Sequence, residues 1–354
     1  MYQLPSGTYN ETYAQEMAIV RTPAHWGILI VGLIILFILP LFLPRDLLYL
    51  CNLIGITIIA VQGLNILTGS CGQISLGHAA FMMVAAYVST WLSVYWGFSF
   101  WAALPLAALS SGVVGLIFGA PSLRVKGFYL AMSTLAAQFI IPWCIRNIHP
   151  AWTGGFSPLR LPPPTLGAIT FNTEASMFYI IMPMTVLGVF FVKNILRSRL
   201  GRAFVAIRDN DLAAEVAGID IFRYKLIAFF ISSLYAGVAG CLWAYWIRTA
   251  YYTHFTFDAS IWFLGMLIVG GLGSVVGACV GPVFIRCLDH FLPLLGPALV
   301  GTLPGFTSGS DVTVALKPLL FGLVVLLFIV FEPRGINHRW EIFKSYYRLW
   351  PFSY

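Results

Sequence analysis

A glycine-rich stretch at residues 63–81 carries the polar side chains best suited to bind a small solute. Apolar runs flank it, and its four glycines weaken a helix where lipid would otherwise favour one. At such a break, helix N-termini can face the carboxylate of an amino acid, and freed carbonyls can face its ammonium group. The candidate solute-pathway residues in this stretch are Asn65, Thr68, Gly69, Ser70, Gln73, Ser75 and His78.

The polar residues of this stretch recur at helical spacing. Gln62, Asn65 and Thr68 follow one another at intervals of three, as do Ser75 and His78, so each set lies near one helical face. We expect this polar stripe to face the interior of a bundle. The same pattern is typical of hydrogen bonds between helices, and both interpretations stay open. His78 fits a packed, neutral histidine better than a proton relay.

Two further groups are weaker candidates for the solute pathway. Thr134 and Gln138 are four residues apart, beside a basic loop that contains Arg124 and Lys126. A second glycine-rich interruption at residues 269–277 includes Gly270 and Gly271. Paired interruptions suggest two related halves with a site between them, although close helix packing through glycine gives the same pattern.

The loop at residues 196–225 has the features of a coupling element. Its second half predicts a short amphipathic helix, which Asn210 or Asp211 caps and Gly218 ends in the left-handed conformation. A rigid helix of this kind could transmit motion from an ATPase. The sequence lacks the GxxxxGK[ST] phosphate-binding motif, so we expect the ATPase to be a separate chain. The alternative is a basic loop that only anchors the topology.

The elements that position these residues are membrane spans. The chain of 354 residues is 59% hydrophobic and only 9% charged, against roughly 25% charged in a soluble domain. We predict an all-α, polytopic transmembrane helical bundle of about ten spans (8–10), with broken glycine-rich helices and a cytoplasmic coupling helix. The predicted spans are 26–43, 48–68, 78–96, 100–120, 128–145, 176–195, 226–247, 261–275, 278–295 and 317–331.

The distribution of basic residues predicts the orientation. With both termini in the cytoplasm, fourteen lysines and arginines lie inside and five outside, which satisfies the positive-inside rule. This gives a cytoplasmic N-terminal segment (1–25), a permease domain (26–331) and a basic cytoplasmic tail (332–354). The external loops are then 146–175 and 296–316. Glu11 and Glu16 precede the first apolar run, so we expect no cleaved signal peptide.

The same residue types argue against other classes of protein. The six cysteines are single and lack metal-ligand spacing, so they predict packing residues and no metal site. The net charge of +7 follows the topology, so we expect no nucleic-acid partner. An ion-coupled secondary transporter should show unpaired acidic residues in mid-membrane, and a membrane enzyme should show clustered catalytic groups. Neither class predicts the coupling loop.

Five ordered motifs together resemble the permeases of high-affinity branched-chain amino acid ABC importers, in particular the LivM-like subunit. They are Gly63 to Phe81, Leu123 to Ala131 with Thr134-Leu135, Ser198 to Gly218, Gly270 to Ser274, and Phe331 to Ile336. By this resemblance Ala213, Ala214, Glu215 and Gly218 fall on the ATPase-coupling loop, which also contains Arg199, Gly201 and Arg202. Thr153, Gly154 and Gly155 resemble the family's external motif.

The resemblance also implies partners and a location. These are a second, LivH-like permease subunit, two cytoplasmic ATPase subunits that bind ATP and Mg, an external solute-binding protein and the lipid of a bacterial inner membrane. No cofactor is expected on this chain itself, which would transport rather than catalyse. The implied solutes are branched-chain or related amino acids. The alternatives are urea, amides or another small solute within the same family.

Overall fold

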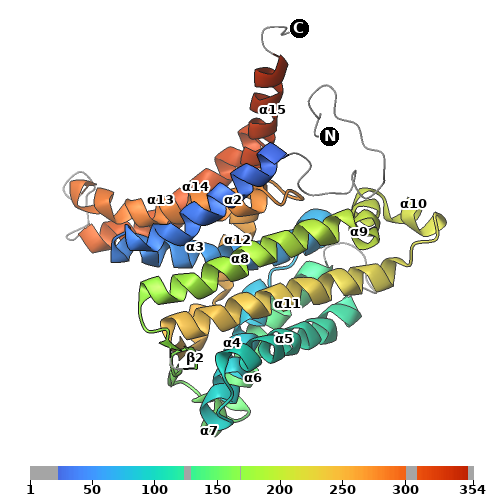
Figure 1. Ribbon diagram of the computed structural model, residues 1–354. Helices are drawn as coiled ribbons and strands as arrows, with labels where there is room; N and C mark the ends of the chain where they lie inside the picture. Colours follow the sequence, from blue (N-terminus) through green and yellow to red (C-terminus); the bar gives the residue numbers. More distant parts are fainter. Residues whose placement is uncertain (1–22, 123–128, 168, 300–308, 350–354) are drawn as a thin grey trace.

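The computed structural model describes residues 23–122, 129–167, 169–299 and 309–349 of the chain (Figure 1). Five predicted features fall wholly or partly outside these residues. They are the N-terminal segment up to residue 22, the basic loop with Arg124 and Lys126, residue 168 of the first external loop, residues 300–308 of the second, and residues 350–354 of the C-terminal tail.

Helices make up most of the described chain, as predicted. They are α2 (Pro23–Ile38), η1 (Leu39–Leu41), α3 (Arg45–Leu64), η2 (Asn65–Ser70), α4 (His78–Tyr95), α5 (Phe100–Ser122), α6 (Tyr129–Asn147), α7 (Pro150–Thr153), α8 (Glu174–Arg197), α9 (Arg199–Asp209), α10 (Asp211–Val216), α11 (Ile221–Ile247), η3 (Tyr252–His254), α12 (Phe257–Gly270), α13 (Gly277–Leu299), α14 (Gly309–Phe331) and α15 (Gly335–Leu349).

Several of these helices meet the requirements of a membrane span. Within the described residues, six stretches are long and apolar enough to cross the hydrocarbon layer. They are Arg45–Ser70, Phe100–Pro121, Glu174–Arg197, Ile221–Ile247, Tyr252–Gly270 and Val314–Phe331. Each of the ten predicted segments overlaps a helix. The chain is therefore a polytopic helical protein.

Helix α11 lies at the centre of the bundle and packs against α3, α4 and α5. The contact with α4 includes an edge-to-face pair of Phe81 and Phe229, whose ring centroids are 5.7 Å apart. At Gly240 a β-carbon would lie 2.0 Å from the carbonyl oxygen of Met82. Glycine thus lets the two backbones approach, which is how helices associate in lipid.

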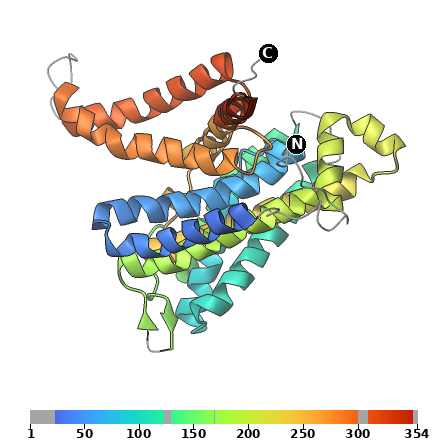
Figure 2. The same cartoon turned by 45° about the horizontal axis from the view of Figure 1, so that its top comes forward.

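The C-terminal helices form a second group beside this core. Helix α13 packs on α3, α12 and α14, as Figures 1 and 2 show. Helix α14 is the outermost of them, and the residues of its apolar window Val314–Phe331 are exposed or half-buried except Phe321, which is buried against Trp262 of α12. Its apolar surface is thus available to lipid or to another subunit.

The two ends of the bundle differ. At one end lie α7 and four strands of two residues each: β1 (Leu159–Arg160), β2 (Thr165–Leu166), β3 (Ile169–Thr170) and β4 (Thr249–Ala250). Strand β1 pairs antiparallel with β4, and β2 with β3. These short pairings lie in loops, where backbone outside a helix must still find hydrogen-bond partners, and the all-α class is as predicted. At the other end lie α9 and α10.

Candidate functional site

The predicted break between the second and third apolar segments is present in the structure. Helix α3 continues into the wider turn η2, and α4 begins only at His78. Between them the backbone folds back, so that the Gln73 N–H donates to the Leu67 carbonyl at 3.0 Å and the Thr68 hydroxyl to the Gln73 carbonyl at 3.0 Å. The Thr68 side chain and the Gln73 backbone thus form hydrogen bonds inside the break.

The break contacts the second glycine-rich interruption, about two hundred residues later in the chain. The Asn65 amide donates to the Ser274 carbonyl at 3.2 Å and accepts from the Gly273 N–H at 2.9 Å. One turn earlier, the Gln62 amide donates to the Val275 carbonyl at 2.8 Å. The polar stripe therefore binds the backbone between α12 and α13.

Glycine is required where these segments meet. A β-carbon at Gly69 would lie 2.4 Å from the Gly273 nitrogen, and one at Gly335 would lie 2.5 Å from the Gly271 α-carbon. Both Gly271 and Gly335 have positive φ, at 115° and 74°. One contact region, here called the glycine junction, is thus formed by Gly69, Gly271, Gly273 and Gly335. It brings three of the sequence motifs together.

Arg208 joins the glycine junction to α9. Its Nη1 donates to the Gly69 carbonyl at 3.1 Å and would lie 3.0 Å from a β-carbon at Gly273. The same guanidinium binds the Asp209 carboxylate at 2.9 Å. This role of Arg208 was not predicted from the sequence. Its spacing from the glycines carries no signal of the contact.

The loop between α8 and α11 folds into two short helices. Asn210, rather than Asp211, caps α10, because its side chain accepts from the Ala213 N–H at 3.1 Å. Gly218 has a φ of 84° just beyond the end of α10. On α10 the side chains of Leu212 and Val216 are 60% and 91% exposed, while Ala214 is buried.

The remaining predicted residues of this loop occupy different settings. Ala213 and Glu215 are exposed on α10, and Arg199 and Arg202 are exposed on α9. Gly201 is buried, and a β-carbon there would lie 2.2 Å from the Leu196 carbonyl oxygen. Gly201 therefore fixes the approach of α9 to the end of α8. The exposed side chains are free to contact another chain.

Several predicted solute-pathway residues form hydrogen bonds with backbone groups around the start of α4. The Gln138 carbonyl oxygen accepts from the Ala80 N–H at 3.0 Å, and its amide donates to the Phe255 carbonyl at 2.9 Å. The Thr134 hydroxyl accepts from the Leu76 N–H at 3.0 Å. His78 Nε2 lies 2.9 Å from the Ala60 carbonyl oxygen. These groups bind protein backbone in the structure.

Other predicted pathway residues have different surroundings. Ser70 and Gly270 are buried. The Ser75 hydroxyl is buried without a hydrogen-bond partner among the described residues. Gln73 is half-buried, and its amide makes a long bond of 3.3 Å to the Cys71 carbonyl. Of these side chains, Ser75 is the one whose hydroxyl is buried without a partner in the described part of the chain.

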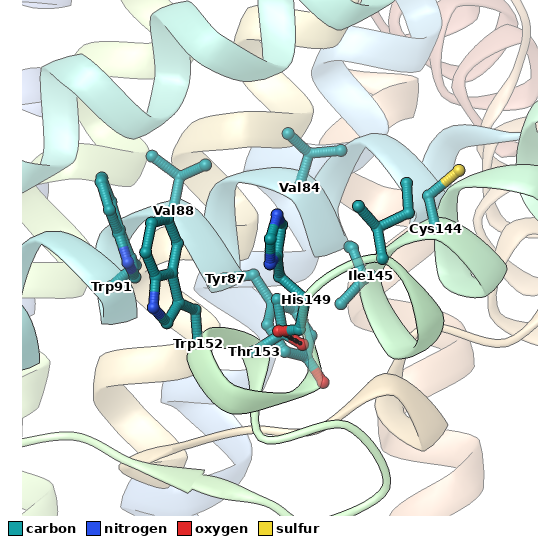
Figure 3. Close-up of a pocket in the computed structure, with 10 residues that line it drawn as sticks. Val84, Tyr87, Val88, Trp91, Cys144, Ile145, His149, Trp152 and Thr153 are labelled. Carbon is teal, nitrogen blue, oxygen red and sulfur yellow. Dashed lines mark hydrogen bonds between the residues drawn. The ribbon is translucent and has the colours of Figure 1, made fainter.

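An aromatic cavity of about 310 Å³ lies at the other end of the bundle, between α4, α6 and α7 (Figure 3). Of the predicted site residues, only Thr153 lines it, while Gly154 and Gly155 form the turn that follows α7 with φ of 74° and 58°. The rest of the lining comes from Val84, Tyr87, Val88, Trp91, Cys144, Ile145, Ile148, His149 and Trp152. The sequence analysis did not predict this cavity.

The fold and these contacts define a helical membrane protein with broken spans and an exposed, capped helix at one end. Comparison with known families agrees with that class. The family described as branched-chain amino acid transport system / permease component matches residues 47–330. The chain therefore belongs to this family, and the predicted resemblance is confirmed.

Individual relatives have related but distinct names. The chain is 32% identical over 261 residues to the high-affinity branched-chain amino acid transport system permease protein LivM of Escherichia coli strain K12, covering 66% of this chain and 61% of that protein. It is 25% identical over 237 residues to a probable LivM of Methanocaldococcus jannaschii, covering 66% and 67%. It is 26% identical over 259 residues to the ribose import permease protein RbsC of Escherichia coli strain K12, covering 69% and 74%.

The matched region thus spans less than two thirds of the length of the Escherichia coli LivM protein. No solved structure matches this chain significantly.

Proposed function

We propose that this chain is a membrane permease subunit of an ATP-binding cassette importer for branched-chain or related amino acids. The observation that carries the proposal is the contact of Arg208 with the glycine junction, since it links an exposed coupling helix to two broken spans. Family membership supports the same function. The partners would be a second permease subunit, two ATPase subunits and an external solute-binding protein.

In this proposal α10 seats in a groove of an ATPase subunit. The exposed Leu212 and Val216 side chains would supply the apolar contact, and Ala213, Glu215 and Gly218 would border it. Helix α10 packs on α9, and α9 ends at the Arg208 contact. Movement of the ATPase would thus reach the junction of Gly69 and Gly273. The binding of ATP and Mg belongs to the partner subunits.

The chain would cross the bilayer about ten times, with both termini in the cytoplasm. Contacts between loops support this topology. Loops assigned to the outside are joined by the pairing of β1 with β4. Loops assigned to the inside meet at the glycine junction. The exposed Arg199 and Arg202 lie at the latter end, which agrees with the positive-inside rule.

The solute would pass beside the two breaks. We assign Ser75, Gln73 and the freed backbone near Ser70 to the solute pathway, because the Ser75 hydroxyl has no partner among the described residues. The other polar residues would hold the breaks in shape, since each already bonds to backbone: Asn65, Thr68, His78, Thr134 and Gln138. Gly69, Gly270 and Gly271 would allow the backbones to approach.

The test is uptake by the reconstituted complex. The chain is coexpressed with its neighbouring permease, ATPase and binding-protein genes, and the purified complex is placed in liposomes. ATP-dependent uptake of leucine, isoleucine or valine is expected. Uptake of ribose, urea or an amide instead would keep the transport mechanism but reject the solute. Solute uptake driven by an ion gradient without ATPase subunits would overturn the proposal.

A further inference from the structure

Helix α15 leaves the bundle in a direction unlike that of the spans. In Figure 1 it stands upright while α8, α11 and α14 run across the view, and in Figure 2 it is seen nearly end-on while α13 and α14 lie lengthwise. The two views agree that α15 is transverse to the spans. A helix transverse to spans at their end runs along the membrane surface.

The turn into α15 is fixed by packing. Gly335 has a φ of 74° and lies against Gly270 and Gly271, so the chain changes direction directly after α14. Only the first turn of α15 is held in this way, with Gly335 buried and Ile336 half-buried against the core. The rest of the helix projects from the bundle at the end where α9 and α10 lie.

The projecting part of α15 has an aromatic face that no other helix covers among the described residues. Trp340 and Phe343 are three residues apart, so they share one face, and their rings stack at 5.8 Å. They are 50% and 61% exposed. An exposed aromatic pair on a transverse helix is typical of a helix that lies in the membrane interface.

Basic side chains border this face. The Lys344 ammonium lies 5.3 Å from the Trp340 ring centroid, and the exposed Arg334 and Arg339 are close in sequence. Arg339 pairs with Glu332, which fixes it beside the end of α14. Lysine and arginine beside an interfacial aromatic face complement the phosphates of anionic lipids.

We propose that α15 is an interfacial helix that binds the anionic lipid surface next to the spans. Trp340 and Phe343 enter the headgroup region, and Lys344 and Arg339 contact lipid phosphates. The inference rests on the chain spanning a membrane, but it requires no ATP-driven transport. It therefore stands or falls separately from the solute and the coupling mechanism.

The test is site-specific photo-crosslinking of the full-length chain. A benzophenone amino acid replaces Phe343 on the aromatic face or, as the matched control, Ser345, which lies on the opposite side of the helix. Both variants are irradiated in cell membranes that contain the partner subunits, and the adducts are identified by mass. Lipid adducts several-fold more abundant at position 343 than at position 345, enriched in phosphatidylglycerol over phosphatidylethanolamine, are expected.

A second arm tests the charge. In vesicles of phosphatidylethanolamine and phosphatidylglycerol, the double variant Arg339→Ala, Lys344→Ala should lose most of the phosphatidylglycerol adduct at position 343. Adducts to an ATPase subunit or another protein at position 343 would overturn the proposal, as would equal lipid adducts at both positions. An undiminished phosphatidylglycerol adduct in the double variant would overturn the charge contact.

Discussion

The guanidinium of Arg208 donates a hydrogen bond of 3.1 Å to the carbonyl oxygen of Gly69, a residue 139 positions earlier in the chain. Arg208 is in the last turn of α9, and Gly69 is in the break after α3. This bond connects the segment proposed to meet an ATPase with the segment proposed to line the solute pathway.

The exposed face of α10 should be needed for assembly. Val216→Asp places a charge on a side chain that is 91% exposed, so the fold should be kept while the apolar contact with an ATPase subunit is lost. We expect the ATPase subunits to stop copurifying with the variant. The matched control is Ile169→Asp, which changes an exposed apolar residue at the opposite end of the bundle. Unchanged copurification of Val216→Asp would contradict the proposed contact.

The glycine junction should not tolerate a methyl group. Gly271→Ala would place a β-carbon 2.7 Å from the Arg334 carbonyl oxygen at a φ of 115°. We expect the free energy of unfolding to fall by about 1–3 kcal/mol, as for other strained backbone positions. Thermal unfolding of the purified protein measures the change. Gly322→Ala is the control, because within the described residues no atom outside its own stretch of helix lies within 4 Å of its β-carbon position. Equal melting temperatures of the two variants would contradict the expected backbone strain at position 271.

Gln138 should stabilise the start of α4 rather than select the solute. Gln138→Leu removes the donor to the Phe255 carbonyl and leaves the Ala80 N–H only its 3.1 Å bond to the Gly77 carbonyl, which should cost about 1–3 kcal/mol of stability. In uptake assays the maximal rate should fall while the KM changes little. Asn147→Ala, an exposed amide on the same helix, is the control. A large rise in KM with normal stability would instead indicate that Gln138 contacts solute.

Glu174 should hold three helices together. Its carboxylate accepts from the Trp246 indole N–H at 2.8 Å and from the Asn52 amide at 3.0 Å, so it joins α8 to α11 and α3. Glu174→Ala should lower the free energy of unfolding by roughly 1–2 kcal/mol, the scale of polar contacts between membrane helices. The exposed Glu341→Ala is the control. The account of this contact is wrong if both variants unfold at the same temperature.

Local features of the fold followed from the sequence because local chemistry determines them. Apolar length predicted segments that all overlap helices. The glycines between residues 63 and 81 predicted the break before His78, and the Asn210 side chain caps α10 as an N-cap residue should. These features depend on neighbours within a few residues.

The contacts that assemble the site did not follow from the sequence. The bond of Arg208 to Gly69 and the approach of Gly335 to Gly271 join segments far apart in the chain, and helical periodicity does not encode which segments meet. For the same reason the cavity beside Trp91 and Trp152 was not predicted, since its lining comes from separate helices. The polar stripe faces the interior of the bundle, as predicted. Of its two interpretations, solute binding and hydrogen bonds between segments of the bundle, the second describes Asn65 in the structure.

The number of solute molecules imported per ATP hydrolysed by the Arg208→Ala variant tests the central claim most directly. Arg223→Ala, which removes an exposed arginine from the first turn of α11, is the control. Loss of a charged hydrogen bond worth about 1.5–3 kcal/mol should lower uptake per ATP by roughly tenfold or more while ATP hydrolysis continues. Uptake per ATP equal to that of the unaltered complex would contradict transmission through Arg208.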